Sequence, residues 1–166
     1  MVPEIKTWEV EEAIRTTSPD KAPGEDKIPS RILYEAIQEL KEPLTRLFNH
    51  CLITGYCPAY FRRLITVALR KLKKGDFKDP KMYRPIALLN IVGKVMDKVL
   101  AKQMLFMVDA YGLLPRTYTG GRAAAGCKHA VHLLLEKIHA AWQIEEEDVV
   151  SLLMLNISGA FNNISH

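Results

Sequence analysis

The strongest constraint on the fold is a basic segment, residues 62–84, that contains one short apolar run and is followed directly by another. It holds nine basic and two acidic side chains, whereas residues 1–61 hold seven basic and ten acidic ones and residues 85–166 hold seven of each. The two runs, Leu64–Leu69 and Pro85–Leu89, are apolar and partly β-branched, which favours strands. The pattern therefore predicts two strands joined by a long charged connection.

Helical periodicity organises most of the remaining chain. Thr7 and Asn90 are the expected N-caps of two helices, and Gly55 is the expected C-terminal stop of a third. The unbroken apolar run Val149–Leu155 predicts a buried strand. Helices and strands alternate, so the predicted class is mixed, α+β, and mostly helical. Apolar residues recur at spacings of three and four in five segments: 7–16, 32–36, 39–54, 90–110 and 127–142.

Length and composition indicate one globular domain. The chain has 166 residues, of which 48% are hydrophobic and 25% charged. Its start carries acids and lacks the apolar stretch of a secretory signal, and its apolar runs are too short to span a bilayer. We therefore expect an intracellular protein without a membrane partner, and the choice between nucleus and cytoplasm stays open. The three cysteines, Cys51, Cys57 and Cys127, are expected to be reduced packing residues.

The whole positive excess of the chain lies in residues 62–84, which is the pattern of a surface that binds a polyanion. The alternative is a solvated loop that only aids solubility. Because the charges are clustered between two strand-like runs, we favour the polyanion.

Four segments, in order along the chain, resemble the signatures of reverse transcriptases encoded by non-LTR, LINE-like retrotransposons. Lys21-Ala-Pro-Gly-Glu-Asp-Lys-Ile-Pro29 is similar to the family's Lys-Ala-Pro-Gly-Pro-Asp-Gly-Ile-Pro. Arg70–Asp76, with the following Tyr-Arg-Pro-Ile-Ala-Leu-Leu at 83–89, resembles its Lys-Pro-Gly-Lys and Tyr-Arg-Pro-Ile-Ser-Leu-Leu pair. Leu114-Pro115 with Gly120-Gly-Arg122 resembles the stretch before the palm. The last segment, Asn156-Ile-Ser-Gly-Ala-Phe-Asn-Asn-Ile-Ser-His166, is similar to Asp-Val-Ser-Gly-Ala-Phe-Asp-Asn-Val-Ser-His.

This resemblance implies a partial right-hand polymerase, with fingers that include a short hairpin and with the first strand of the palm. In the family, two Mg²⁺ ions assist an in-line displacement at a phosphate, and carboxylates hold them. The implied partners are an RNA template, a DNA primer and deoxynucleotide triphosphates. The implied domain is incomplete and divides into an N-terminal helical region at 1–61, a basic fingers segment and helix at 62–122, and a helix and first palm strand at 123–166.

Carried over residue by residue, the resemblance implies nucleotide-binding roles for four positions. Lys71, Lys73 and Arg84 match the basic fingers positions, and the planar guanidinium of arginine suits a phosphate because it can contact two oxygens. Phe161 matches the aromatic residue that screens the sugar 2′ position. Taken alone, Arg84 and Phe161 would be a surface arginine and a core aromatic.

The sequence also departs from the family. Asn156 stands at the catalytic position of the metal-binding Asp, and its neutral amide is a poor ligand for a divalent cation. Asn162 and Lys27 stand where the family has Asp and Gly. The Ala123–Lys128 stretch lacks the family's Arg and Ser/Thr side chains, and the sequence ends at His166, before the family's Asp-Asp hairpin. We therefore expect no intact metal site, no cofactor and no polymerase activity in the chain as written.

Three hypotheses remain. The chain is a reverse transcriptase segment by descent that is catalytically inactive, a non-catalytic module that binds nucleic acid through residues 62–84, or an inert retrotransposon remnant. The sequence leaves the oligomeric state open.

Overall fold

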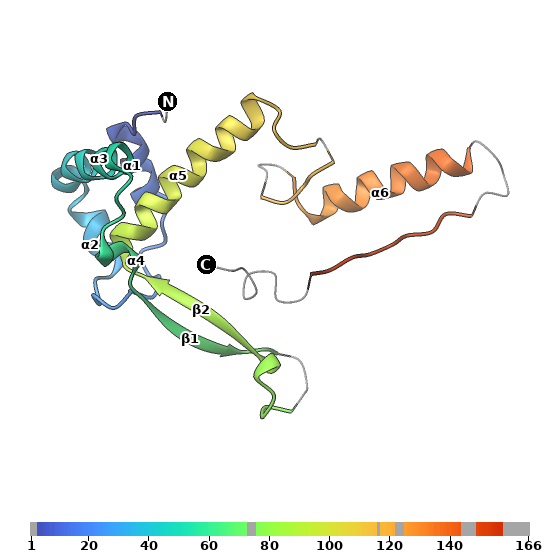
Figure 1. Cartoon of the computed structure of the whole chain (residues 1–166), viewed down its shortest axis with the longest axis horizontal. Coiled ribbons are helices and arrows are strands. Elements are labelled where there is room, and N and C mark those ends of the chain that lie inside the picture. Colours follow the sequence, from blue (N-terminus) through green and yellow to red (C-terminus); the bar gives the residue numbers. More distant parts are fainter. Residues whose placement is uncertain (1–2, 73–75, 116, 122–124, 144–148, 158–166) are drawn as a thin grey trace. The chain divides into compact units, whose positions relative to one another are not determined.

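The computed structural model describes residues 3–72, 76–115, 117–121, 125–143 and 149–157. The chain forms two compact units, residues 1–112 and residues 113–166, which are described separately. The first unit contains five helices among its described residues, a 3₁₀ turn and a two-stranded hairpin, and the second contains one helix (Figure 1). The chain is therefore a mixed helix and strand protein, as the sequence predicts.

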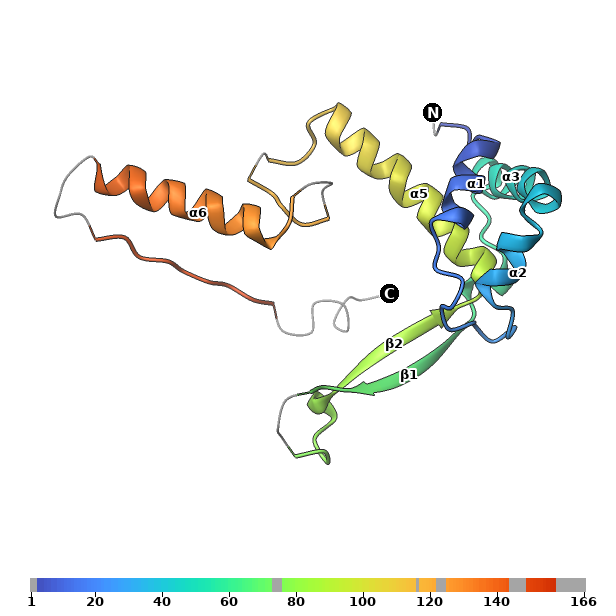
Figure 2. The same cartoon turned by 180° about the vertical axis from the view of Figure 1, so that it is seen from behind.

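The core of the first unit lies where α1 (Thr7–Arg15) contacts both α3 (Ile37–Thr54) and α5 (Ile91–Ala110), which Figure 2 shows from behind. Its largest fully buried side chain, Phe48, lies edge-on to Phe61 with ring centroids 6.4 Å apart. The short helices α2 (Ser30–Glu35) and α4 (Ala59–Arg62) complete the core. The sequence did not predict α4, because four residues are too few to show a period.

The ends of the long helices test the capping predictions. Helix α3 ends at Gly55, whose φ of 63° is left-handed, as predicted. Helix α1 is capped by Lys6 and not by Thr7: the carboxylate of Glu9 accepts a hydrogen bond from the Lys6 backbone N–H at 2.8 Å. Asn90 is the N-cap of α5, but its side chain does not bond the helix.

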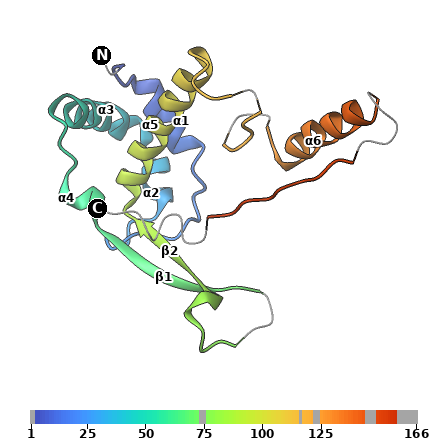
Figure 3. The same ribbon diagram turned by 45° about the vertical axis from the view of Figure 1, so that its right-hand side comes forward.

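The predicted strands form an antiparallel hairpin, β1 (Leu64–Arg70) and β2 (Tyr83–Leu89), that extends away from the helices (Figure 3). Every residue of β1 is exposed. A 3₁₀ turn, η1 (Pro80–Met82), interrupts the connection, and Asp79 caps it by accepting a hydrogen bond from the Lys81 backbone N–H at 2.9 Å. The prediction of two strands with a long charged connection is confirmed.

The second unit contains α6 (Cys127–Trp142), with the bounds that the sequence predicts. No residue of α6 is buried. The predicted strand at 149–155 is wrong, because residues 149–157 form neither strand nor helix and Leu155 is 85% exposed. An apolar run forms a buried strand only where neighbouring strands pair with it, and the described strands, β1 and β2, pair only with each other.

Two further expectations concern the cysteines and the membrane. Cys51 is buried, as expected, but Cys57 and Cys127 are exposed free thiols and so do not pack in a core. Among the described helices, none is both long and apolar enough to cross a bilayer.

Candidate nucleic-acid interface

The hairpin brings two of the predicted binding residues onto one face. Arg84 pairs in register with Leu69, and the ladder continues to Lys71, whose backbone N–H donates to the Met82 carbonyl at 2.8 Å. Since side chains alternate between the faces of a sheet, Leu69, Lys71 and Arg84 share a face, and Lys71 and Arg84 are diagonal neighbours. Two sequence-predicted cations thus lie close together near the end of the hairpin.

Side chains within and next to the connection between β1 and β2 hold it in a defined conformation. The Lys71 ammonium donates to the Lys81 carbonyl at 2.5 Å, which holds the two ends of the connection together. On the opposite face Arg70 lies over the ring of Phe77, 2.9 Å from its centroid, and the Tyr83 hydroxyl donates to the Phe77 carbonyl at 3.2 Å. The basic segment is therefore an ordered element at these positions.

The two acids of this segment do not neutralise its cations. Asp76 accepts a hydrogen bond from the Lys78 backbone N–H at 2.9 Å, and Asp79 caps η1. Within the described residues of 62–84, no basic side chain pairs with a carboxylate. The positive charge of the hairpin is thus available to an external anion. Lys73 lies outside the described residues, so its position is not part of this geometry.

The base of the hairpin is joined to the loop that carries the Lys-Ala-Pro-Gly motif. Asn90, which follows β2, is 1% exposed; its side-chain oxygen accepts from the Asp26 backbone N–H at 3.3 Å, and its amide nitrogen donates to the Tyr60 carbonyl at 2.9 Å. Tyr60 in turn donates its hydroxyl to Asp26 at 2.5 Å. The pKa of Tyr60 is raised to about 12, mainly by its hydrogen bond to the Asp26 carboxylate and, to a smaller extent, by burial of the phenol and by the charge of Asp26.

Sequence reasoning missed this network, since it assigned Asn90 only a capping role. The signal was the motif itself. A Cβ on Gly24 would lie 2.4 Å from the Asn90 side-chain oxygen, so only glycine fits there. Lys27, where the family has Gly, has a φ of 56° and is the only non-glycine residue with a positive φ among those described. A side chain is strained in that conformation, which explains why glycine suits the position.

Asn156 is exposed and lies in the irregular segment 149–157. Among the described residues no group of three or more His, Cys, Asp or Glu side chains could hold a metal ion. Segment 149–157 contains no acid, and the Asn156 amide supplies one neutral oxygen, so these residues do not fit a divalent metal centre. Phe161 and Asn162 lie outside the described residues.

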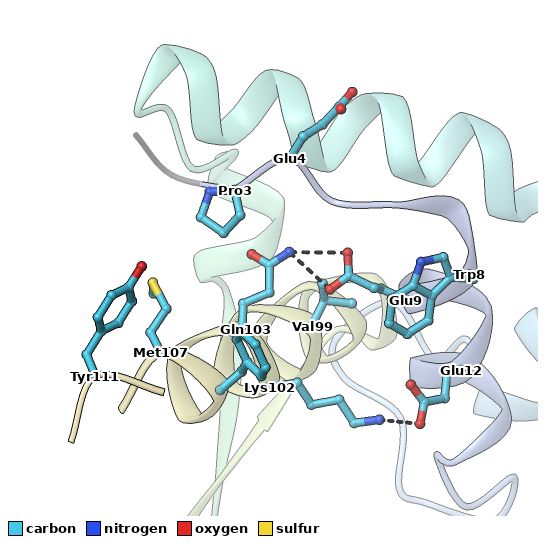
Figure 4. Close-up of a pocket in the computed structure, with 11 residues that line it drawn as sticks. Pro3, Glu4, Trp8, Glu9, Glu12, Val99, Lys102, Gln103, Met107 and Tyr111 are labelled. Carbon is cyan, nitrogen blue, oxygen red and sulfur yellow. Dashed lines mark hydrogen bonds and ion pairs between the residues drawn. The ribbon is translucent and has the colours of Figure 1, made fainter. Parts of the chain in front are cut away.

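A hollow of about 520 Å³ lies between α1 and the C-terminal half of α5, away from the predicted site (Figure 4). Its walls include Trp8, and four of its polar side chains pair with one another: Gln103 donates to Glu9 at 3.1 Å, and Lys102 pairs with Glu12 at 2.6 Å. Neither Lys71, Arg84 nor Asn156 lines it.

No protein-family model matches the chain. Curated proteins do match it along nearly all its length. The chain is 29% identical over 95% of its residues to the probable RNA-directed DNA polymerase from transposon X-element of Drosophila melanogaster, and 27% identical over 95% to the RNA-directed DNA polymerase from mobile element jockey of the same species. It is 30% identical over 98% of its residues to the retrovirus-related Pol polyprotein from type-1 retrotransposable element R1 of Bradysia coprophila.

The chain thus resembles, along nearly all of its length, one segment of proteins of the reverse transcriptase class. In particular, it is homologous to a segment of the RNA-directed DNA polymerases of non-LTR retrotransposons, as its motifs indicate. It spans 16–17% of the length of these three relatives.

Proposed function

We propose that the chain is the fingers and the beginning of the palm of a retrotransposon reverse transcriptase, a domain that by descent synthesises DNA on an RNA template. The observation that carries the proposal is a match to such polymerases over 95–98% of the chain. The proposed fold is a partial right hand in which the β1–β2 hairpin belongs to the fingers. The proposed partners are an RNA template, a DNA primer and deoxynucleotide triphosphates.

In this proposal the hairpin cations bind phosphate. Arg84 and Lys71 share one face of the hairpin and lack carboxylate partners within the described residues. A guanidinium can donate two parallel hydrogen bonds to phosphate oxygens, and a neighbouring ammonium adds charge without competing for the same geometry. Lys73 and Phe161 have their proposed roles, in phosphate binding and at the sugar 2′ position, from the sequence alone.

We propose further that Asn156 removes polymerase activity. Compared with aspartate, an asparagine has no negative charge and a single oxygen, so it neither attracts a divalent ion nor balances its charge. Residues 149–166 contain no Asp or Glu that could replace the missing aspartate.

A chimera tests this proposal. The matching segment of the jockey RNA-directed DNA polymerase is replaced by this chain, either unchanged or with Asn156→Asp, and primer extension on an RNA template is measured with Mg²⁺. We expect extension only with Asn156→Asp. Asn163→Asp, a nearby amide outside the matched catalytic position, is the control and should not restore activity. Equal extension by the unchanged and Asn156→Asp chimeras would show that Asn156 does not occupy the ligand position.

A second candidate function is favoured by the uncompensated charge on the hairpin. A module that binds RNA or DNA without catalysis needs only residues 62–84. It predicts binding that weakens with salt and is lost when Lys71, Lys73, Lys74 and Arg84 are replaced by glutamine. Lys41→Gln is a suitable control, because Lys41 pairs with Glu11 at 3.0 Å on the helical part of the unit. Absence of binding at low salt would reject this function. If the chimera with Asn156→Asp is also inactive, the remaining hypothesis is an inert retrotransposon remnant.

A further inference from the structure

A second cluster of positive charge lies outside the hairpin, where α5 faces the loop of residues 17–27. The Lys94 ammonium donates to the Ala22 carbonyl at 2.9 Å, and the Lys98 ammonium, one turn further along α5, donates to the Thr17 hydroxyl oxygen at 3.2 Å. Lys21, on the same loop, is exposed. Lys21 is also close enough for its charge to act on both Lys94 and Lys98, so ammonium groups from two distant parts of the sequence gather on one side of α5.

This arrangement is electrostatically unfavourable in the free protein. Burial lowers the pKa of Lys94 and of Lys98, and the neighbouring Lys21 ammonium lowers both further. Lys102 adds to the repulsion on Lys98. The charged forms are thus disfavoured by both desolvation and mutual repulsion.

The nearby acids leave the cluster uncompensated. Asp26 attracts Lys94, but its carboxylate already accepts hydrogen bonds from the Tyr60 hydroxyl and, at 3.2 Å, from the Ile28 backbone N–H. Glu12 attracts Lys98, but it pairs with Lys102 at 2.6 Å. Among the described residues, no carboxylate forms an ion pair with Lys21, Lys94 or Lys98.

Each of the two half-buried ammonium groups has donors to spare. An ammonium carries three N–H donors, and Lys94 and Lys98 each use one of them on the loop. The backbone positions of Lys94 and Lys98 lie about 6 Å apart along the α5 axis, and the loop contacts hold the two side-chain nitrogens in place. A row of fixed cations suits a ligand that presents negative groups repeatedly, as a nucleic-acid strand does.

We propose that Lys21, Lys94 and Lys98 form a phosphate-binding site for a nucleic-acid backbone, separate from the basic segment of the hairpin. The inference rests on the proposed nucleic-acid function and assigns that function a second contact surface. The two surfaces lie in the same unit, because β2 leads through Asn90 directly into α5 (Figure 1). A bound phosphate offsets the repulsion among the lysines and accepts their remaining hydrogen bonds.

Binding of a single-stranded RNA oligonucleotide as a function of salt tests the site. Replacing Lys94 and Lys98 together by glutamine should reduce the magnitude of the slope of log K against log salt concentration by about 1.4. Each phosphate contact to a single strand contributes about 0.7 to this slope. Lys21→Gln should lower it by about 0.7. The matched control is Lys41→Gln, which removes the same charge from α3, where Lys41 already pairs with Glu11 at 3.0 Å. It should leave the slope unchanged.

Circular dichroism shows whether each variant is folded. If the α5 variants are unfolded, Lys21→Gln still tests the site, because Lys21 is an exposed residue of the loop. An unchanged slope in folded Lys21→Gln and in the double variant would overturn the site. If the hairpin glutamine variants still lose binding, the proposed nucleic-acid function survives that result. A wild-type chain that does not bind RNA at low salt overturns both.

A melting-temperature measurement with pyrophosphate distinguishes a nucleic-acid strand from a free phosphate compound as the ligand of this site. If pyrophosphate raises the melting temperature of the wild type through Lys94 and Lys98, while the RNA slope is the same in the wild type and the double variant, the ligand is a free phosphate compound and the inferred strand is wrong. We expect the reverse: a change in the RNA slope with little stabilisation by pyrophosphate.

Discussion

Gly24 packs directly against Asn90: a Cβ at position 24 would lie 2.4 Å from the Asn90 side-chain oxygen and 2.6 Å from its backbone nitrogen. This contact joins the loop of residues 17–27 to the junction between β2 and α5. The φ of Gly24 is not in the left-handed region, so the requirement for glycine is one of space and not of backbone conformation.

Gly24→Ala is therefore expected to destabilise the first unit by about 2 kcal/mol, the usual cost of inserting a methyl group against fixed atoms. Urea denaturation measures the change. Gly93→Ala is the matched control, because its Cβ would meet Phe61 atoms at 3.4–3.5 Å, an ordinary contact distance. Since alanine favours a helix over glycine, this control should be neutral or stabilising by ~0.5–1 kcal/mol. A Gly24→Ala protein as stable as the wild type would contradict the close packing.

Lys27→Gly should stabilise the chain by about 0.5–1 kcal/mol, because a lysine with a φ of 56° is strained and glycine is not. The same denaturation measurement applies. Lys27→Ala serves as the control: it removes the exposed side chain but keeps the Cβ, so it should give no gain. If alanine and glycine stabilise equally, charge and not backbone strain is the cause.

The Tyr60–Asp26 hydrogen bond predicts a pH dependence. The pKa of Tyr60 is raised to about 12 from its ordinary value of 10.0, so the folded chain holds the phenol proton more tightly than the unfolded chain. The stability that this bond contributes is present below pH 10 and lost as the pH rises towards 12. Asp26→Asn should bring the pKa of Tyr60 down towards its ordinary value, and ultraviolet absorbance of the phenolate measures it.

Tyr60→Phe identifies which step of that titration belongs to Tyr60, since the chain has six tyrosines. Identical titration curves for the wild type and Asp26→Asn would mean that the carboxylate does not hold the phenol proton.

The apolar segment 149–157 should drive self-association. Leu153 and Leu155 are 79% and 85% exposed, so Leu153→Ser and Leu155→Ser remove apolar surface from water without creating a cavity. We expect less aggregation in light scattering and an unchanged melting temperature. Phe48→Ala is the contrast: it empties a fully buried position and should cost about 3–5 kcal/mol. A marked loss of stability in the serine variants would mean that the segment packs against other residues.

Much of the first unit could be predicted from local patterns. The hairpin is set by two apolar runs around a charged connection, and α3 and α5 by their apolar periodicity and by Gly55. These features depend on residues near one another in sequence, so they can be predicted without knowledge of the tertiary structure. The position of Arg84 and Lys71 on a common face follows only from the register, which no single segment specifies.

The features that were predicted wrongly or missed also have physical explanations. The sequence predicts a buried strand at 149–155, but a strand needs partners, and apolarity alone does not supply them. Asn90 fits the N-cap pattern and is the N-cap, yet its side chain bonds Asp26 and Tyr60, which are distant in sequence. The spacing of Lys94 and Lys98 was visible in the sequence, but their convergence with Lys21 required the loop to be placed on α5.

The bond between Asn90 and Asp26 also bears on the order of folding. It closes a contact between residues 64 positions apart, and closing so long a chain segment costs entropy that local helices do not face. We expect this loop to dock after the helices have packed, so that breaking the contact speeds unfolding and leaves the folding rate nearly unchanged. The loop that bears the family's first motif is thus expected to be the last part of the unit to settle and the first to detach.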